Sequence, residues 1–492
     1  MNKIIEKKYL KVKFMLDSPL IIGCGKSENT DNDLITDSAG YPYIPGTAIA
    51  GVIREALSET GLFNDSDIKE YLGFVEINRE KSQKPAQNNN NPNNTKKDSE
   101  NESRIIFYDA NLTDECRANA NVTIRDSVKL DEYKTAEKGA KFDMEVLEPG
   151  VIFETYIEMN NTGTDVDKEK NIWEAIKAIW KEGNITFGGK TTRGMGAIKT
   201  EGEDSIQEKD FDLSVPARLE EWIDFRMYDS SVSWNKPKFN SSAFTGNMHK
   251  IELELNLLGG ISIRCYSTEK DAPDYSQLTV KSVNNTDETP VIPGTTWAGA
   301  FRRRMTSLLR LSGYGNEESR LIISLFFGNV EPGKKGDKRK SKITFSESRI
   351  EGGTWKTITR NAIDRFTGGS ADGALYTEKT YYGGETSLVI KIKEVSDAEF
   401  DVFKNKYKAE TGSEPAEKKD ITNAFFKAFA AALADLHGGY LAIGGLTAVG
   451  RGLFTVKSVS GSDKEIKNPE IVYNMIVGQL IKDEEQEVIS NG

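Results

Sequence analysis

Several carboxylates gather in one short polar segment near the start of the chain. Residues 23–37 contain Asp31, Asp33 and Asp37 together with two glycines. Carboxylates at such spacing can hold a divalent cation or position a hydroxyl group for attack. Asp37 stands just before a predicted turn, where an aspartate can instead bond its own backbone. From the residues alone, a solvated polar loop is the simpler interpretation.

A second acidic segment in the other half of the chain includes Asp274. An ungapped alignment of the two segments on Leu34 and Leu278 places Asp31 opposite Tyr275, one residue from Asp274. A slip of one residue within a loop would make the two aspartates equivalent. Asp274 is therefore a further candidate, and a loss of the acid in this half stays open.

Two glycine-rich loops, 185–196 and 441–452, end the two halves. Glycine lets backbone N–H groups approach a phosphate closely. Lys190, Arg193 and Arg451 lie within these loops, and a guanidinium binds phosphate oxygens in a fork. The alternative is a tight turn whose arginine forms a structural salt bridge. The spacing does not match a Walker loop.

Further cations stand on two predicted helices, 48–57 and 296–305. The first carries Arg54, and the second carries three consecutive arginines from Arg302 to Arg304. They could line a groove for a polyanion, although a run of charge is more often a solvated face. At least one of three consecutive helical residues must point away from any groove.

Composition narrows the function classes. The chain has 492 residues, 37% hydrophobic and 29% charged, with a formal net charge of −11. No run approaches the roughly 18 apolar residues of a membrane helix, and the N-terminus lacks a signal peptide's apolar region, so we expect a cytoplasmic protein. Three dispersed cysteines and two histidines, His249 and His437, do not form a zinc site. Both histidines are expected to be structural.

The elements that position these residues occur twice, in the same order. Each half has an alternating strand, an Ile-Pro-Gly-Thr turn before a helix, an aromatic-Gly segment before a strand, a mixed-charge segment before another strand, and a helix before a glycine-rich loop. Gly46 and Gly294 lie 248 residues apart, and Gly189 and Gly445 lie 256 apart. Five ordered matches at nearly one offset indicate a duplication.

Each half reads strand, helix, strands, helix, strand, which predicts an α+β fold of two tandem ferredoxin-like (RRM-like) domains with inserted segments. We expect a first domain at 1–205, a linker at 206–246, a second domain at 247–462 and an acidic tail at 463–492. The asparagine-rich insertion at about 79–102 has almost no apolar residues, so we expect it to be disordered.

The acidic loop, the Ile-Pro-Gly-Thr turn with its helix and the terminal glycine-rich loop, all present twice, resemble the RAMP superfamily of CRISPR systems. The resemblance covers roughly residues 8–200 and 250–457. Within the superfamily, the chain most resembles backbone subunits of type III effector complexes. Two fused copies look like the double-backbone subunits of type III-D-like systems, with RAMP domains carrying a thumb-like hairpin.

The resemblance implies a backbone subunit that binds CRISPR RNA and cuts complementary target RNA with Mg²⁺ or Mn²⁺. It makes Asp31 the first choice as catalytic and metal-binding residue, followed by Asp33 and, in the second copy, Asp274. It also implies partners: a large polymerase/cyclase-like subunit, other RAMP subunits and a small subunit, with no membrane. RNA contacts are expected from the residues in the loops, helices and thumb positions: Arg54, Arg125, Lys129, Lys190, Arg193, Arg302, Arg360, Arg365 and Arg451.

Two other functions stay open at this point. A non-catalytic scaffold would hold the guide RNA without cutting its target, and degraded acidic loops would favour it. A guide-processing ribonuclease of the same superfamily usually relies on histidine or other acid/base groups without metal. The scarcity of histidine and the tandem repeat count against the second alternative.

Overall fold

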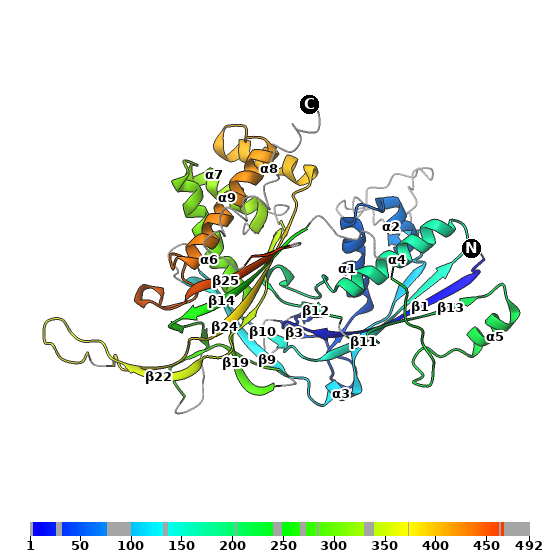
Figure 1. Cartoon of the computed structure of the whole chain (residues 1–492), viewed down its shortest axis with the longest axis horizontal. Coiled ribbons are helices and arrows are strands. Elements are labelled where there is room, and N and C mark those ends of the chain that lie inside the picture. The colour runs from blue at the N-terminus through cyan, green and yellow to red at the C-terminus, as the bar shows by residue number, and fades with distance from the viewer. Residues whose placement is uncertain are drawn as a thin grey trace, which may run out of the picture.

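The structure is a computed structural model, and it describes residues 3–25, 32–75, 100–130, 136–200, 202, 204–239, 248–265, 272–282, 285–328, 339–371, 373–461 and 464–466. Two sheets with their helices, built from the two halves of the chain, lie side by side (Figure 1). We call them the first and second unit. Asp31, most of the asparagine-rich insertion and nearly all of the acidic tail lie outside the described residues.

The first unit is built around the long strand β1 (Glu6–Leu16). Its alternation buries Leu10, Val12, Phe14 and Leu16 on one face, as period-two strands do. β1 pairs antiparallel with β11, β12 and β13, and β11 continues to β7 and β8. The strands of this sheet are β4 (Tyr43–Ile44), β7 (Ile105–Phe107), β8 (Ala110–Leu112), β11 (Ile152–Asn161), β12 (Ile198–Lys199) and β13 (Ile206–Asp212).

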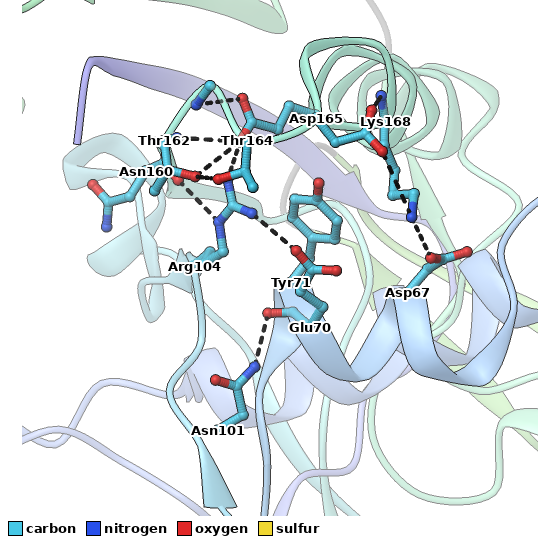
Figure 2. A network of polar contacts seen from close by, with 12 residues as sticks. Asp67, Glu70, Tyr71, Asn101, Arg104, Asn160, Thr162, Thr164, Asp165 and Lys168 are labelled. Atoms are coloured by element: carbon cyan, nitrogen blue, oxygen red, sulfur yellow. Dashed lines mark hydrogen bonds and ion pairs between the residues drawn. The ribbon is translucent and has the colours of Figure 1, made fainter. Parts of the chain in front are cut away.

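Helices α1 (Gly46–Glu59), α2 (Asp65–Leu72), α4 (Val166–Glu182) and α5 (Pro216–Asp224) belong to the first unit, with the single-turn helix α3 (Asp114–Arg117). Figure 2 shows how polar contacts join α2 to α4. Arg104 pairs with Glu70 at 3.2 Å and with Glu169, and Lys168 pairs with Asp67 at 2.8 Å. Pairs between elements fix the helices relative to the strand that Arg104 precedes.

The second unit repeats this plan around β14 (Met248–Leu258), which pairs antiparallel with β24 and β25. The sheet order is β20-β24-β14-β25-β26. Its remaining elements are β20 (Ile343–Phe345), β24 (Glu385–Lys393), β25 (Leu453–Gly461), β26 (Lys464–Ile466), α6 (Gly294–Leu311), α7 (Asn316–Phe327), α8 (Asp397–Thr411) and α9 (Lys418–His437). The order strand, helix, strand, strand, helix, strand therefore occurs in both units.

Repeated hydrogen bonds around the glycine-rich loops show the same backbone path in the two units. The N–H of Gly189 donates to Ile21 O at 2.7 Å, and the N–H of Gly445 donates to Ser262 O at 2.8 Å. The loops contain the short 3₁₀ turns η2 (Thr191–Arg193) and η3 (Thr447–Val449). The units thus share both their sheet order and their loop conformation.

Each unit also carries a β-hairpin: β9 (Val122–Leu130) with β10 (Ala136–Leu147), and β22 (Thr354–Arg360) with β23 (Tyr376–Tyr382). The second hairpin projects away from the rest of the molecule (Figure 1). The first lies at the junction between the units. The remaining strands are β2 (Gly23–Gly25), β3 (Asp33–Leu34), β5 (Phe74–Val75), β6 (Glu100–Asn101), β15 (Gly260–Ile261), β16 (Arg264–Cys265), β17 (Tyr275–Gln277), β18 (Thr279–Ser282), β19 (Asn285–Ile292) and β21 (Ser348–Arg349).

The helix starts differ from the sequence prediction in one respect. The helices predicted at 48–57 and 296–305 begin two residues earlier, α1 at Gly46 with Pro45 as its N-cap and α6 at Gly294 with Pro293 as its N-cap. Neither cap involves a side chain of the N-cap residue. In the first unit Asp109 supplies the acceptor instead, because its Oδ1 receives the Gly46 N–H at 2.6 Å. No helix in the described part of the chain is long and apolar enough to cross a membrane.

Candidate nucleic-acid interface

The glycine-rich loop of the first unit meets the second unit where α6 begins. A Cβ atom on Gly194 would collide with the carbonyl oxygen of Phe345, and a Cβ atom on Gly294 would collide with the carbonyls of Phe345 and Arg193. Backbones therefore approach at a distance that only glycine permits. This contact places the side chains of the loop beside those of α6.

Three cations meet at this junction: Lys190 and Arg193 from the loop and Arg302 from α6. Arg193 and Arg302 are exposed, and neither has a carboxylate partner among the residues that the structure describes. Desolvation, followed by the charges of Arg320 and Arg193, holds the pKa of Arg302 below its usual value. Mutual repulsion without a counter-ion marks a site that favours an anion. We call these three residues the junction cations.

Lys190 is the most enclosed of the junction cations. Its backbone has a φ of 56°, in the left-handed region, and its ammonium lies 3.9 Å from the centre of the Phe142 ring and 3.0 Å from Met144 Sδ. Burial, with a smaller effect of Arg193, lowers the pKa of Lys190 to about 8. The equivalent residue in the second unit is Leu446, also left-handed at φ 53°, so only the first loop carries this lysine.

The other arginines of the two helices have separate roles. Arg304 turns toward α9 and pairs with Asp435 at 2.6 Å, so one of the three consecutive arginines does point away from the junction. Arg54 donates through Nη2 to the carbonyls of Leu72 and Gly73, at 2.9 and 2.7 Å, and closes the end of α2. That contact is structural, and an RNA contact of Arg54 stays a prediction.

Arg125 of the first hairpin is 7% exposed and joins the two units. Its guanidinium donates to Glu148 at 2.8 Å and to Glu347 of the second unit at 2.7 Å. Glu148 is itself 2% exposed. Two buried carboxylates engage the guanidinium, so these contacts of Arg125 are structural, and an RNA contact of Arg125 stays a prediction. Lys129 lies further along β9, and nothing is described of its side chain.

Arg451 of the second glycine-rich loop is 3% exposed and pairs with Glu378 of β23 at 2.7 Å. Arg360 of the neighbouring strand shares the same carboxylate at 3.0 Å. Arg451 therefore forms a structural salt bridge, which was the alternative to phosphate binding for the loop arginines, and Arg360 joins the same ion pair. Arg365 is different, because it lies exposed at the hairpin tip without an ion-pair partner among the described residues.

The two acidic segments can now be aligned by their hydrogen bonds. The N–H of Ile35 donates to Ile22 O, and the N–H of Leu278 donates to Ile263 O, both at 2.8 Å. Ile35 and Leu278 are therefore equivalent, rather than Leu34 and Leu278. Counting four residues back from each gives Asp31 and Asp274, so the slip of one residue considered from the sequence is the register that the structure supports.

Of the predicted acidic residues, two lie within the described structure. Asp33 belongs to β3, which pairs with β2. Asp274 is exposed, and its Oδ2 receives the N–H of Thr377 from the second hairpin at 2.7 Å. A residue that sequence reasoning missed, Glu145 of β10, accepts the N–H of Leu34 at 3.0 Å. Its place in an alternating strand gave no sign of that contact.

A family model for the RAMP superfamily matches residues 13–199 and 275–455. The chain belongs to the RAMP superfamily. The two matched regions lie one in each unit, in agreement with a tandem RAMP protein. No curated protein matches the chain in sequence.

Membership of the RAMP superfamily indicates a CRISPR-associated RNA-binding protein that works within a multisubunit complex. Among the described residues, no group of three or more His, Cys, Asp or Glu side chains could hold a metal ion. A metal site centred on Asp31 is a proposal, because that residue lies outside the described part.

Both histidines have structural contacts, and the ring of His249 packs edge-on against Phe426. His437 of α9 accepts the N–H of Val456 through Nδ1 at 3.1 Å. A ring nitrogen engaged with backbone is poorly placed to exchange protons with a substrate. This contact argues against a histidine-based processing ribonuclease at this position.

Proposed function

We propose that this RAMP protein is a backbone subunit of a type III CRISPR effector complex and that it holds CRISPR RNA across the junction between its two units. The observation that carries the proposal is the set of junction cations. They come from both units, and the charge of Arg193 helps to lower the pKa of each of the other two. None has a carboxylate partner among the described residues, and the glycine-rich loop brings its backbone to the same junction.

The physical argument concerns the phosphates of the guide. The phosphates of a single RNA strand that crosses the junction would supply the negative charge that the junction cations lack. Binding would also release cations condensed on the RNA, which favours the complex. Arg193 and Arg302 can each meet a phosphate, because a guanidinium matches its oxygens. Base-specific contacts are not required, since a backbone subunit must accept any guide sequence.

We further propose that the acidic segment of the first unit supports cleavage of the paired target RNA, with Asp31 as its principal carboxylate and Asp274 as its equivalent in the second unit. Attack of a 2′-hydroxyl on its own phosphate breaks the strand. A bound Mg²⁺ or Mn²⁺ would neutralise the charge that develops on that phosphate. A scaffold without cleavage is the second candidate, and the cleavage experiment below separates the two.

The binding proposal is tested by replacing Arg193 and Arg302 together with alanine. We expect the affinity for guide RNA at 150 mM salt to fall by about tenfold or more, and the slope of log K against log salt to decrease by about 1 for each lost phosphate contact. Fluorescence anisotropy at several salt concentrations measures both. Arg310→Ala, an exposed arginine near the other end of α6, is the matched control and should bind normally. Equal affinity of the double variant and this control would reject the interface.

The cleavage proposal is tested in the assembled complex with magnesium and target RNA. Asp31→Ala should remove one set of cuts while guide binding persists, because the carboxylate contributes to chemistry rather than affinity. Asp274→Ala should remove a different set if the second unit is active. Persistence of every cut in the Asp31 variant would refute this assignment, and absence of cuts by the wild-type complex would favour the scaffold.

A further inference from the structure

Glu145 holds the backbone on both sides of Asp33. Its N–H donates to the carbonyl of Asn32 at 3.1 Å, and its Oε2 accepts the N–H of Leu34 at 3.0 Å. Glu145 lies on β10, the second strand of the first hairpin. Asp33 is thus tied to the hairpin by a residue 112 positions later in the chain.

The second unit has a backbone ladder at the equivalent place. There β17 and β23 form a parallel ladder, in which Ser276 pairs with Lys379. In a parallel ladder a residue makes two hydrogen bonds to the partner strand. Its N–H donates to the carbonyl of one partner residue, and its carbonyl accepts the N–H of the partner residue two positions later. Glu145 makes the first bond with its backbone and the second with its carboxylate, so a side chain takes the place of a backbone carbonyl.

The register of the acidic segments makes Asp33 equivalent to Ser276 and Glu145 equivalent to Lys379. The Ile35–Ile22 and Leu278–Ile263 hydrogen bonds fix that register. The first unit therefore places two carboxylates at positions where the second has a hydroxyl and an ammonium. A carboxylate acceptor also makes a stronger hydrogen bond than a neutral carbonyl.

We propose that Glu145 is the positioning residue of the first acidic segment: it fixes the backbone around Asp33 and couples that segment to the hairpin. The inference rests on the proposed cleavage function for its consequence, but the positioning itself can be measured without RNA. The second unit has Ser276 and Lys379 at these positions. Its side-chain bond between the acidic segment and the hairpin is a different one, from the Thr377 N–H to Asp274 Oδ2 at 2.7 Å.

Hydrogen–deuterium exchange on the full chain tests the positioning. In Glu145→Ala the amide of Leu34 should exchange about tenfold faster, because its charged acceptor is lost. Glu145→Gln should remain close to wild type, since its side-chain oxygen still accepts. Lys379→Ala is the matched control: a ladder made of backbone carbonyls should leave exchange at 275–278 unchanged. Unchanged exchange of Leu34 in Glu145→Ala would overturn the proposal.

Target cleavage by the assembled complex supplies the second measurement. Glu145→Ala should lower kcat of the Asp31-dependent cuts about tenfold, with KM and guide affinity unchanged. Glu145→Gln should keep kcat close to the wild-type value. Wild-type kcat in Glu145→Ala, despite faster exchange at Leu34, would overturn the positioning role. If the wild-type complex makes no cuts, the cleavage function fails, and the exchange result alone then decides whether Glu145 positions the segment.

Discussion

Arg451 and Met195 occupy the same position in the two units, just before the last glycine of each loop. In the second unit Arg451 pairs with Glu378 of the hairpin. In the first unit Met195 lies in an apolar cluster with Met144 of its own hairpin. One contact between loop and hairpin is thus made by charge in one unit and by apolar packing in the other. A buried ion pair and a packed apolar pair are interchangeable solutions of this kind.

The same comparison separates the two loop arginines that the sequence grouped together. When the paired glycines are aligned, Arg193 falls opposite Val449, not opposite Arg451. Arg193 remains exposed at the junction, whereas Arg451 is enclosed. The signal for this difference was in the sequence, but the carboxylate that engages Arg451 lies 73 residues earlier and could not be identified from spacing.

Lys190 gives a prediction at the residue scale. Since its pKa is about 8, the ammonium is largely charged at pH 7 and largely neutral at pH 9. The affinity for RNA should therefore fall between pH 7 and pH 9 by the contribution of about one ionic contact. The slope of log K against log salt should decrease by about 1 over the same interval. Anisotropy titrations at pH 7, 8 and 9 measure the change. Lys190→Met should bind with an affinity nearly independent of pH, and an unaltered pH profile in this variant would contradict the assignment.

At the scale of elements, patterning predicted most of the fold. The alternation at Leu253, Leu255 and Leu257 predicted a strand, and β14 buries all three. The helix expected before each glycine-rich loop is present, as α4 in the first unit and α9 in the second. Periodicity identifies such elements because each buries one face.

Patterning could not give the contacts that elements make with one another. At the start of α1 the Gly46 N–H donates to the side chain of Asp109, a residue 63 positions later in the chain. The alignment of the acidic segments likewise needed the hydrogen bonds of Ile35 and Leu278. Side-chain partners across long separations are a property of the folded chain, and a local pattern does not contain them.

At the scale of the whole molecule, polar contacts join the two units around the junction. Arg125 pairs with Glu347 deep in the contact, and Lys393 pairs with Glu59 nearer its edge. Arg349 also donates to the carbonyl of Asp17 at 3.3 Å. Because the Arg125 group is buried, it must remain intact for the units to stay in register.

Replacement of Arg125 by alanine should destabilise the protein by about 3–5 kcal/mol, since it leaves two buried carboxylates without a cation. The urea midpoint of unfolding measures this change. Arg117→Ala, which removes an exposed pair with Asp114, is the control and should cost less than about 1 kcal/mol. A similar midpoint for both variants would contradict the structural role of Arg125.

The fusion has a further consequence for assembly. The segment that follows α5 and precedes β14 tethers the second unit to the first. Such a short connection raises the effective concentration of one unit around the other to about the millimolar range. The glycine contact and the cations beside it are then present in every free chain, in a fixed ratio of one unit to one. Two separate polypeptides would have to find each other by diffusion, whereas these two units are already joined covalently when the chain is made.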